Sequence, residues 1–309
     1  MSGGGAIPEL AQRLVGLVRR LMIEVRPRLI GAALSGRRAE NENLRHQDNF
    51  LSDYDLWMHR RYKDLLTELI PSFIYASEEA DPELVGDDPD PDLCVLVDPL
   101  DTSELAVRAL HGYTHILIYS RALARPIVAV VGDIFHHVQA YVAARDAAGD
   151  DIAFLITADG AEHRLAQPSP PSLSEALVTN YLMRPEQRFR PLARQSDFID
   201  ALSAVSGAGK AKGRIGVDFG SVGLCHVAAG FSDAMVEFAK GFAVWDLSPG
   251  HYILYSAGGT VTDLYGTLLP LDCGLGSMET INRAMGRRQK FIAAGNSALA
   301  GEIRKTLHI

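Results

Sequence analysis

The sequence predicts a layered α/β protein with two parts. Its 309 residues, 47% hydrophobic and 22% charged, are enough for two domains of ordinary composition. The front half contains successive apolar runs of strand length separated by turns, which is typical of an antiparallel sheet. The rear half alternates strands with helices. We therefore expect an N-terminal α+β domain over residues 1–183 and a C-terminal α/β domain over residues 184–309.

The front half is expected to begin with two helices. Apolar side chains at helical spacing predict a helix over 8–34, with a kink or break at Pro27, and a second over 52–69. The uninterrupted apolar run Leu93–Val97 is typical of a strand covered on both faces. The other strands expected in this half are 73–76, 114–122, 126–134 and 138–145.

The rear half follows a linker rich in proline and serine over 166–173. Strands are predicted at 176–182, 233–238, 260–264 and 290–295. Helices are predicted at 191–206, 222–229, 248–257 and 297–307. In the helix over 248–257, Asp246 or Ser248 is the expected N-cap.

Charge and cysteine content exclude several classes of function. The 30 basic and 38 acidic residues give a net charge of −8, so a nucleic acid polymer is not expected as a partner, whereas a small phosphate ester remains possible. The 3 cysteines lie far apart without metal-ligand spacing, which favours a reducing compartment. Without a membrane-spanning run or signal peptide, we expect no membrane partner and a cytoplasmic location.

The most informative segment is Asp98-Pro99-Leu100-Asp101, which directly follows the buried strand. Its two carboxylates and the carbonyl of Leu100 are the oxygen ligands that Mg²⁺ prefers. Thr102 and Ser103 come next, at a turn whose backbone N–H groups could face an anion. For these residues alone, a turn in which an aspartate caps the next segment is an equally good interpretation.

Two further acidic segments change that balance. Glu78 and Glu79 follow the short strand 73–76, and Asp246 lies where a loop enters a helix. Alone, the glutamate pair is best interpreted as solvated and Asp246 as a helix cap. In chain order, however, Glu78-Glu79, DPLDTS and WDLSPG resemble the motifs of the inositol monophosphatase superfamily of metal-dependent phosphatases. Segments 224–230, 257–263 and 292–296 also resemble family signatures, and the resemblance covers about residues 45–305.

The resemblance implies a fold, an assembly and a site. The fold would be a layered α-β-α-β-α sandwich and the assembly a homodimer. The cofactor would be Mg²⁺, two or three ions per site, with Mn²⁺ as a substitute and Li⁺ as an inhibitor. The implied metal ligands are Glu78, Asp98, Leu100, Asp101 and Asp246. The implied catalytic residues are Asp55, Ser103 and Glu78. The implied substrate-binding residues are Asp101, Thr102, Ser103, Glu237 and Asp246.

The implied reaction is hydrolysis of a phosphate monoester of a small polyol, an inositol phosphate or a sugar phosphate, by metal-activated water. One alternative is a bisphosphate nucleotidase or fructose-1,6-bisphosphatase type of activity. An alternative of another class is a non-catalytic relative that binds metal or serves as a scaffold. Two departures from the family pattern motivate it: Thr102 replaces a glycine, and Asp53 competes with Asp55 for the water-positioning role.

Other polar clusters receive structural interpretations. His111, His115, His226 and His251 lack the spacing of metal ligands, so we expect them to be structural or solvated. Arg184, Arg188, Arg190 and Arg194 crowd one segment. They either meet a second phosphate or form a solvated helix face, and the solvated face is the favoured interpretation.

Overall fold

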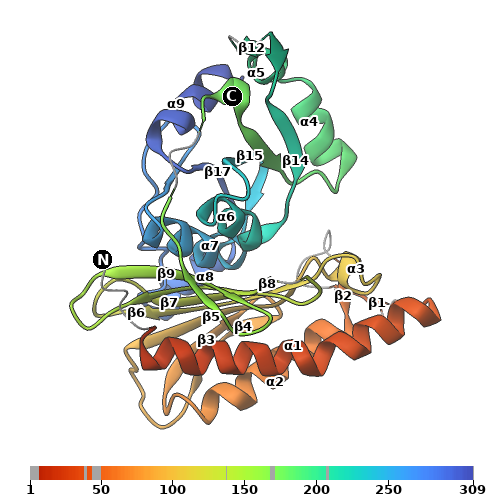
Figure 1. The fold of residues 1–309 in the computed structure, drawn as a ribbon. Helices are drawn as coiled ribbons and strands as arrows, with labels where there is room; N and C mark the ends of the chain where they lie inside the picture. Colours follow the sequence, from red (N-terminus) through yellow and green to blue (C-terminus); the bar gives the residue numbers. More distant parts are fainter. Residues whose placement is uncertain are drawn as a thin grey trace. The chain divides into compact units, whose positions relative to one another are not determined.

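The computed structural model describes residues 7–37, 40–43, 50–136, 138–167, 171–206 and 209–308. The chain divides into two compact units. Unit 1 comprises Met1–Arg164 and Leu271–Gly286, and unit 2 comprises Leu165–Pro270 and Arg287–Ile309. Figure 1 traces the chain through both units. The domain boundary that the sequence predicts, between residues 183 and 184, stays a prediction.

Unit 1 is built on one large sheet. Within the described ranges its strands follow the order β10-β9-β8-β7-β6-β5-β3-β4, antiparallel throughout except for the parallel pair β3 and β5. The strands are β3 Phe73–Ser77, β4 Ala80–Val85, β5 Leu93–Asp101, β6 Tyr113–Ser120, β7 Arg125–Asp133, β8 Val138–Arg145, β9 Asp151–Thr157 and β10 Glu162–Arg164. As predicted, β5 is covered on both faces: Val95 and Leu96 are each fully buried.

Two helices cover one face of this sheet, α1 Glu9–Ser35 and α2 Asp53–Thr67. Their leucines and valines form one core with alternate residues of the strands. The predicted break at Pro27 is wrong, because α1 continues through it: Pro27 lies on the exposed face, and Val25 and Leu29 continue the buried stripe past it. A kink there stays a prediction. The smaller elements of unit 1 are β1 Glu40–Asn41, β2 Leu51–Ser52, α3 Ser103–Ala106 and α8 Met278–Met285.

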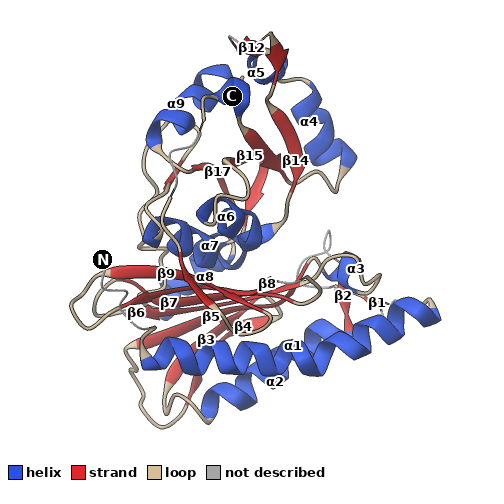
Figure 2. Cartoon of the chain, viewed as in Figure 1, coloured by secondary structure: helices blue, strands red, loops and turns tan. Residues whose placement is uncertain are grey.

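Unit 2 contains a second sheet with helices on both faces (Figure 2). Its strand order is β14-β11-β15-β17-β16. The strands are β11 Leu177–Asn180, β14 Arg214–Val217, β15 Ala234–Phe242, β16 Thr260–Thr262 and β17 Gln289–Ala294. On one face lie α6 Gly220–Ala228 and α7 Val244–Ser256, and on the other α5 Ser196–Ser203 and α9 Ser297–Thr306. The remaining elements are η1 Leu173–Glu175, η2 Pro185–Phe189, α4 Arg190–Ala193, β12 Val205–Ser206 and β13 Lys210–Ala211.

The layered α/β class is confirmed, and the differences from prediction are local. The helix expected over 191–206 is two short helices, α4 and α5. The sequence does not predict the helices α3 and α8 or the strands β1, β2, β4, β9, β10, β12, β13 and β14. In β4 the sequence is acidic and contains Pro82, which suits an edge strand whose pairing is supplied by β3. Among the described residues, no helix has both the length and the apolar character needed to cross a membrane.

Candidate functional site

The segment Asp98–Asp101 forms the end of β5 and does not leave the sheet as a loop. Asp98 still pairs with His115 of β6, then the register shifts, and Asp101 pairs with Tyr113. Such an irregularity bends the strand and re-aims its side chains. As a result, Asp98 and Asp101 both have a carboxylate oxygen close to the ring of His115, at 3.7 Å and 3.3 Å respectively.

Of the two roles expected for His115, structural or solvated, its full burial excludes the solvated one, and its ring lies in this cluster. One ligand atom each from Asp98, Asp101 and His115 lies within 4.8 Å of the others. His115 and Asp98 are fully buried. Sequence spacing did not indicate His115, because antiparallel pairing brings it opposite Asp98 and the register shift that follows brings Asp101 near its other ring nitrogen. The available signal was its place in a predicted strand that follows the acidic segment.

Asp55 and Ser103 are brought together although they are 48 residues apart. Oδ2 of Asp55 accepts hydrogen bonds from the Ser52 N–H at 2.7 Å and the Ser52 hydroxyl at 2.5 Å. The Ser103 hydroxyl is within reach of both Asp55 Oδ1 and the Leu100 carbonyl, the latter at 2.8 Å, and its single hydrogen serves one of them at a time. Burial raises the pKa of Asp55 to about 6, although these hydrogen bonds oppose the rise.

The capping box at the start of α2 is what holds Asp55 in place, because Ser52 is the N-cap and Asp55 the third helical residue. The competing residue, Asp53, is exposed and accepts a hydrogen bond from Asn41 at 2.9 Å. Only Asp55 therefore shares a hydrogen bond with Ser103 among these two aspartates.

Thr102 adopts the conformation that its glycine counterpart in the family would favour. Its φ of 62° and ψ of 38° lie in the left-handed region, and its hydroxyl donates to the Asp101 carbonyl at 2.6 Å. A β-branched residue is strained there, and such strain is often found at functional sites. The conformation starts α3, so that Ser103 is the first residue of that helix.

Glu78 lies beside the same end of the sheet. It occupies the turn between β3 and β4, and its N–H donates to the Val97 carbonyl at 3.2 Å. Because Ser77 and Val97 are register partners on parallel strands, Glu78 and Asp98 each come directly after one of these partners and occupy corresponding positions. Glu78 is half-buried. The structure therefore brings four predicted ligand residues, Glu78, Asp98, Leu100 and Asp101, to one region of unit 1.

Asp246 belongs to unit 2. The helix α7 starts at Val244 with Ala243 as N-cap, so the prediction that Asp246 or Ser248 is the N-cap is wrong. The carboxylate of Asp246 instead accepts the Ala243 N–H at 3.2 Å from the first turn and lies 3.3 Å from an Arg288 nitrogen. Capping by Asp246 from inside the first turn places its carboxylate at the helix N-terminus, where negative charge is favoured.

Glu237, also in unit 2, is buried and densely hydrogen-bonded. Its Oε1 accepts backbone N–H groups of Ala239, Lys240 and Gly241 at 2.9–3.1 Å, and its Oε2 pairs with Arg188. Arg188 lies 4.2 Å from the centre of the Tyr181 ring, and burial lowers its pKa to about 10. A solvated helix face is therefore wrong for Arg188, and contact of Glu237 with substrate hydroxyls stays a prediction.

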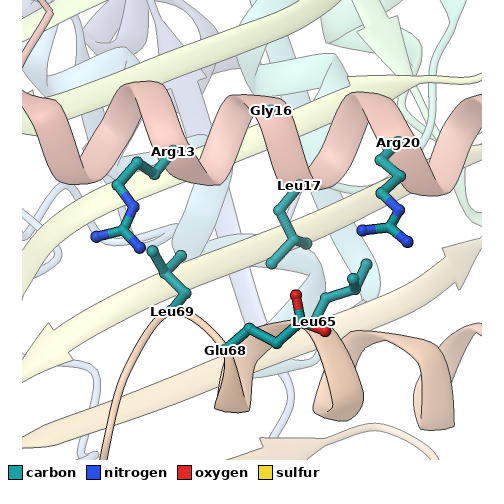
Figure 3. A pocket seen from close by; sticks show the side chains of 7 residues that line it. All are labelled: Arg13, Gly16, Leu17, Arg20, Leu65, Glu68 and Leu69. Carbon is teal, nitrogen blue, oxygen red and sulfur yellow. The ribbon is translucent and has the colours of Figure 1, made fainter.

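A hollow of about 370 Å³ lies elsewhere in unit 1, between α1 and α2. Figure 3 shows Arg13 and Arg20 extending from α1, with Glu68 at the end of α2 and leucines between them. Its charges are mixed and both arginines are exposed. Since none of the predicted site residues lines it, this hollow is not the predicted phosphate site.

The profile of the inositol monophosphatase family matches residues 14–308. The chain belongs to the inositol monophosphatase family. Solved structures with this fold include a calcium-bound IMPase family protein from Staphylococcus aureus, 15% identical, with a TM-score of 0.68 over 97% of this chain and 96% of that one. Another is the extragenic suppressor protein suhB from Bartonella henselae, 18% identical, with a TM-score of 0.63 over 94% and 97%.

A third relative is a dual specific IMPase/NADP phosphatase bound with D-inositol-1-phosphate. It is 14% identical, with a TM-score of 0.66 over 96% of each chain. No curated protein matches the sequence. Identities this low establish a shared fold, and membership of the inositol monophosphatase family comes from the profile match.

Proposed function

We propose that this protein is a Mg²⁺-dependent phosphatase that hydrolyses a phosphate monoester of a small polyol, an inositol phosphate or a sugar phosphate. The observation that carries the proposal is an arrangement in unit 1. The Ser103 hydroxyl is within reach of both Asp55 and the Leu100 carbonyl, and Leu100 lies in the chain between the clustered Asp98 and Asp101. Buried carboxylates this close together repel one another, so this donor set fits a divalent cation.

Each residue of the site has a proposed role. Glu78, Asp98, Asp101, Asp246 and the Leu100 carbonyl would hold the cations. When bound, these cations would neutralise phosphate charge and make water acidic enough to ionise near neutral pH. Ser103 would orient the attacking water through its hydroxyl, and Asp55 would accept a proton from that water. The backbone N–H groups of Thr102 and Ser103 would face the phosphate, with Thr102 held in its left-handed conformation.

The substrate class is supported by the inositol phosphate bound to a structural relative. That relative is described as dual specific for inositol monophosphate and NADP, which supports a nucleotide phosphate as the second candidate, as in a bisphosphate nucleotidase. Glu237 already accepts from four donors, so its carboxylate has less capacity to accept hydroxyls from either candidate substrate.

The test is phosphate release with Mg²⁺ from myo-inositol phosphate, fructose 1,6-bisphosphate, adenosine 3′,5′-bisphosphate and histidinol phosphate. Asp98→Asn and Asp246→Asn should each nearly abolish release, whereas Asp53→Asn, an exposed control, should leave it within about twofold. Release that survives EDTA would exclude the proposed mechanism. Absence of release from every ester in a single-turnover assay would favour the non-catalytic alternative.

The homodimer and the cytoplasmic location implied by the sequence remain proposals. Light scattering coupled to size-exclusion chromatography measures the first directly. A mass of about 67 kDa, twice the 33.5 kDa of one chain, is the expected result.

A further inference from the structure

His115 lies between the two aspartates that the proposed function assigns to a metal. It is the register partner of Asp98 on neighbouring antiparallel strands, and directly opposed side chains share one face of a sheet. Its Nδ1 is 3.7 Å from Asp98 Oδ2, and its Nε2 is 3.3 Å from Asp101 Oδ2. The imidazole thus has a carboxylate at each nitrogen.

The cluster is enclosed by the protein. The exposed fraction of the side chain is 0% for His115, 1% for Asp98 and 11% for Asp101. Ligand bonds of 2.0–2.2 Å place neighbouring ligands on one ion about 3–3.5 Å apart. The 3.3 Å separation between His115 Nε2 and Asp101 Oδ2 is within that range, so both atoms can bind one ion with little movement.

We propose that His115 Nε2 is a metal ligand alongside Asp98 and Asp101, and that it directs this site toward Mn²⁺ or a similar first-row transition ion in preference to Mg²⁺. Mg²⁺ prefers a shell of carboxylate, carbonyl and water oxygens. Imidazole nitrogen binds first-row transition ions more strongly than it binds Mg²⁺, and among those ions Mn²⁺ is the one that also favours carboxylate and carbonyl oxygens. The inference rests on the proposed function in that the site holds a divalent ion, and it replaces Mg²⁺ by Mn²⁺ as the ion preferred at this one position.

The second ring nitrogen fits the same assignment. A metal-bound imidazole commonly donates its other N–H to a carboxylate, which sets the orientation of the ring. Here Nδ1 lies 3.7 Å from Asp98 Oδ2, beyond hydrogen-bond distance, so that role requires the two groups to approach by about 0.5–1 Å. The rival role is a histidine that donates hydrogen bonds to both carboxylates and does not touch the ion. The two roles differ in one observable, a nitrogen bonded to the metal.

The experiment uses the metal-free full-length protein, first titrated separately with Mn²⁺ and Mg²⁺ by calorimetry. We expect Mn²⁺ affinity to fall about 10–100-fold in His115→Gln, and Mg²⁺ affinity to change less than about threefold. The control is His163→Gln on exposed β10, which should leave both affinities unchanged. Electron spin-echo envelope modulation of the Mn²⁺-loaded wild type should show coupling to a bound ¹⁴N, and the coupling should be lost in His115→Gln.

Wild-type spectra without ¹⁴N coupling would overturn the proposal, and this result needs no variant to fold. An unchanged ratio of Mn²⁺ to Mg²⁺ affinity in a folded His115→Gln protein would also overturn it. The metal measurements are separate from phosphatase activity. If nitrogen-bound Mn²⁺ is found but no ester is hydrolysed, the proposed function fails while this inference stands. If esters are hydrolysed with Mg²⁺ but no nitrogen binds the metal, only this inference fails.

Discussion

Replacing Asp55 by asparagine should stabilise the metal-free protein at neutral pH. In the metal-loaded protein the same replacement should remove most of the proposed phosphatase activity. Burial raises the pKa of Asp55 from 3.8 to about 6. The folded state therefore binds more protons than the unfolded state between these values, and stability falls as pH rises from about 4 to 6. About two pKa units correspond to about 3 kcal/mol of lost stability at pH 7.5.

Asparagine can relieve this cost without losing hydrogen bonds. Its Oδ1 can accept from Ser52 in place of the carboxylate oxygen now 2.7 Å from the Ser52 nitrogen. Its amide can donate to Ser103, whose hydroxyl then donates to the Leu100 carbonyl at 2.8 Å. Neutral hydrogen bonds are weaker than those to a carboxylate, so the expected net gain is about 2 kcal/mol. Loss of the proton acceptor should reduce the rate about 10²–10⁴-fold.

The assay is urea unfolding in EDTA between pH 4 and 8 for the wild type, Asp55→Asn and the exposed control Asp53→Asn. The Asp55→Asn advantage should be about 2 kcal/mol at pH 7.5, or about 4–8 °C in Tm for a domain of 150–250 residues, and should shrink toward pH 4. Asp53→Asn should stay within about 0.5 kcal/mol of the wild type. A less stable Asp55→Asn protein, or an advantage independent of pH, would refute the reasoning.

Three further outcomes are expected. Thr102→Gly should raise the unfolding free energy measured in urea by about 0.5–1 kcal/mol, because glycine relieves the left-handed strain at φ 62°. A lower unfolding free energy would show that the threonine hydroxyl stabilises the fold by more than the strain costs. Arg188→Met should lower the unfolding free energy by about 3–5 kcal/mol, because it leaves Glu237 buried without its cation. Adding Glu237→Gln should restore part of this loss, and no restoration would contradict the explanation. Burial lowers the pKa of His251 from 6.5 to about 4. The unfolding free energy should therefore fall by about 3 kcal/mol as the pH falls from about 6.5 to 4. His251→Gln should remove this acid sensitivity, and an unchanged pH profile in the variant would contradict the explanation.

The pH dependences of Asp55 and His251 oppose each other. Between pH 4 and 6.5, protonation of Asp55 favours the folded state and protonation of His251 favours the unfolded state. The wild-type profile alone therefore tests neither group. Each variant must be compared with the wild type at every pH, because the difference cancels the contribution that both proteins share.

Much of the architecture was predictable because its causes are local. Side-chain patterns indicated α1, α2 and the strands β3, β6, β7 and β8, and the apolar run Leu93–Val97 indicated a doubly covered strand. The acidic segment after it was recognisable because its residues are adjacent in the chain. The edge strand β4 was missed because its acidic sequence has low strand propensity and its pairing comes from β3.

What the sequence by itself determined about this protein is its family and its layered class, together with the acidic residues proposed for its site, since these depend on residue type and short spacing. Only the tertiary structure decided which distant side chains meet. His115 opposes Asp98 because of strand register, and Arg188 faces Glu237 because the short helical segment η2 packs against β15. Register and packing depend on how whole elements are buried together, which short sequence patterns do not record.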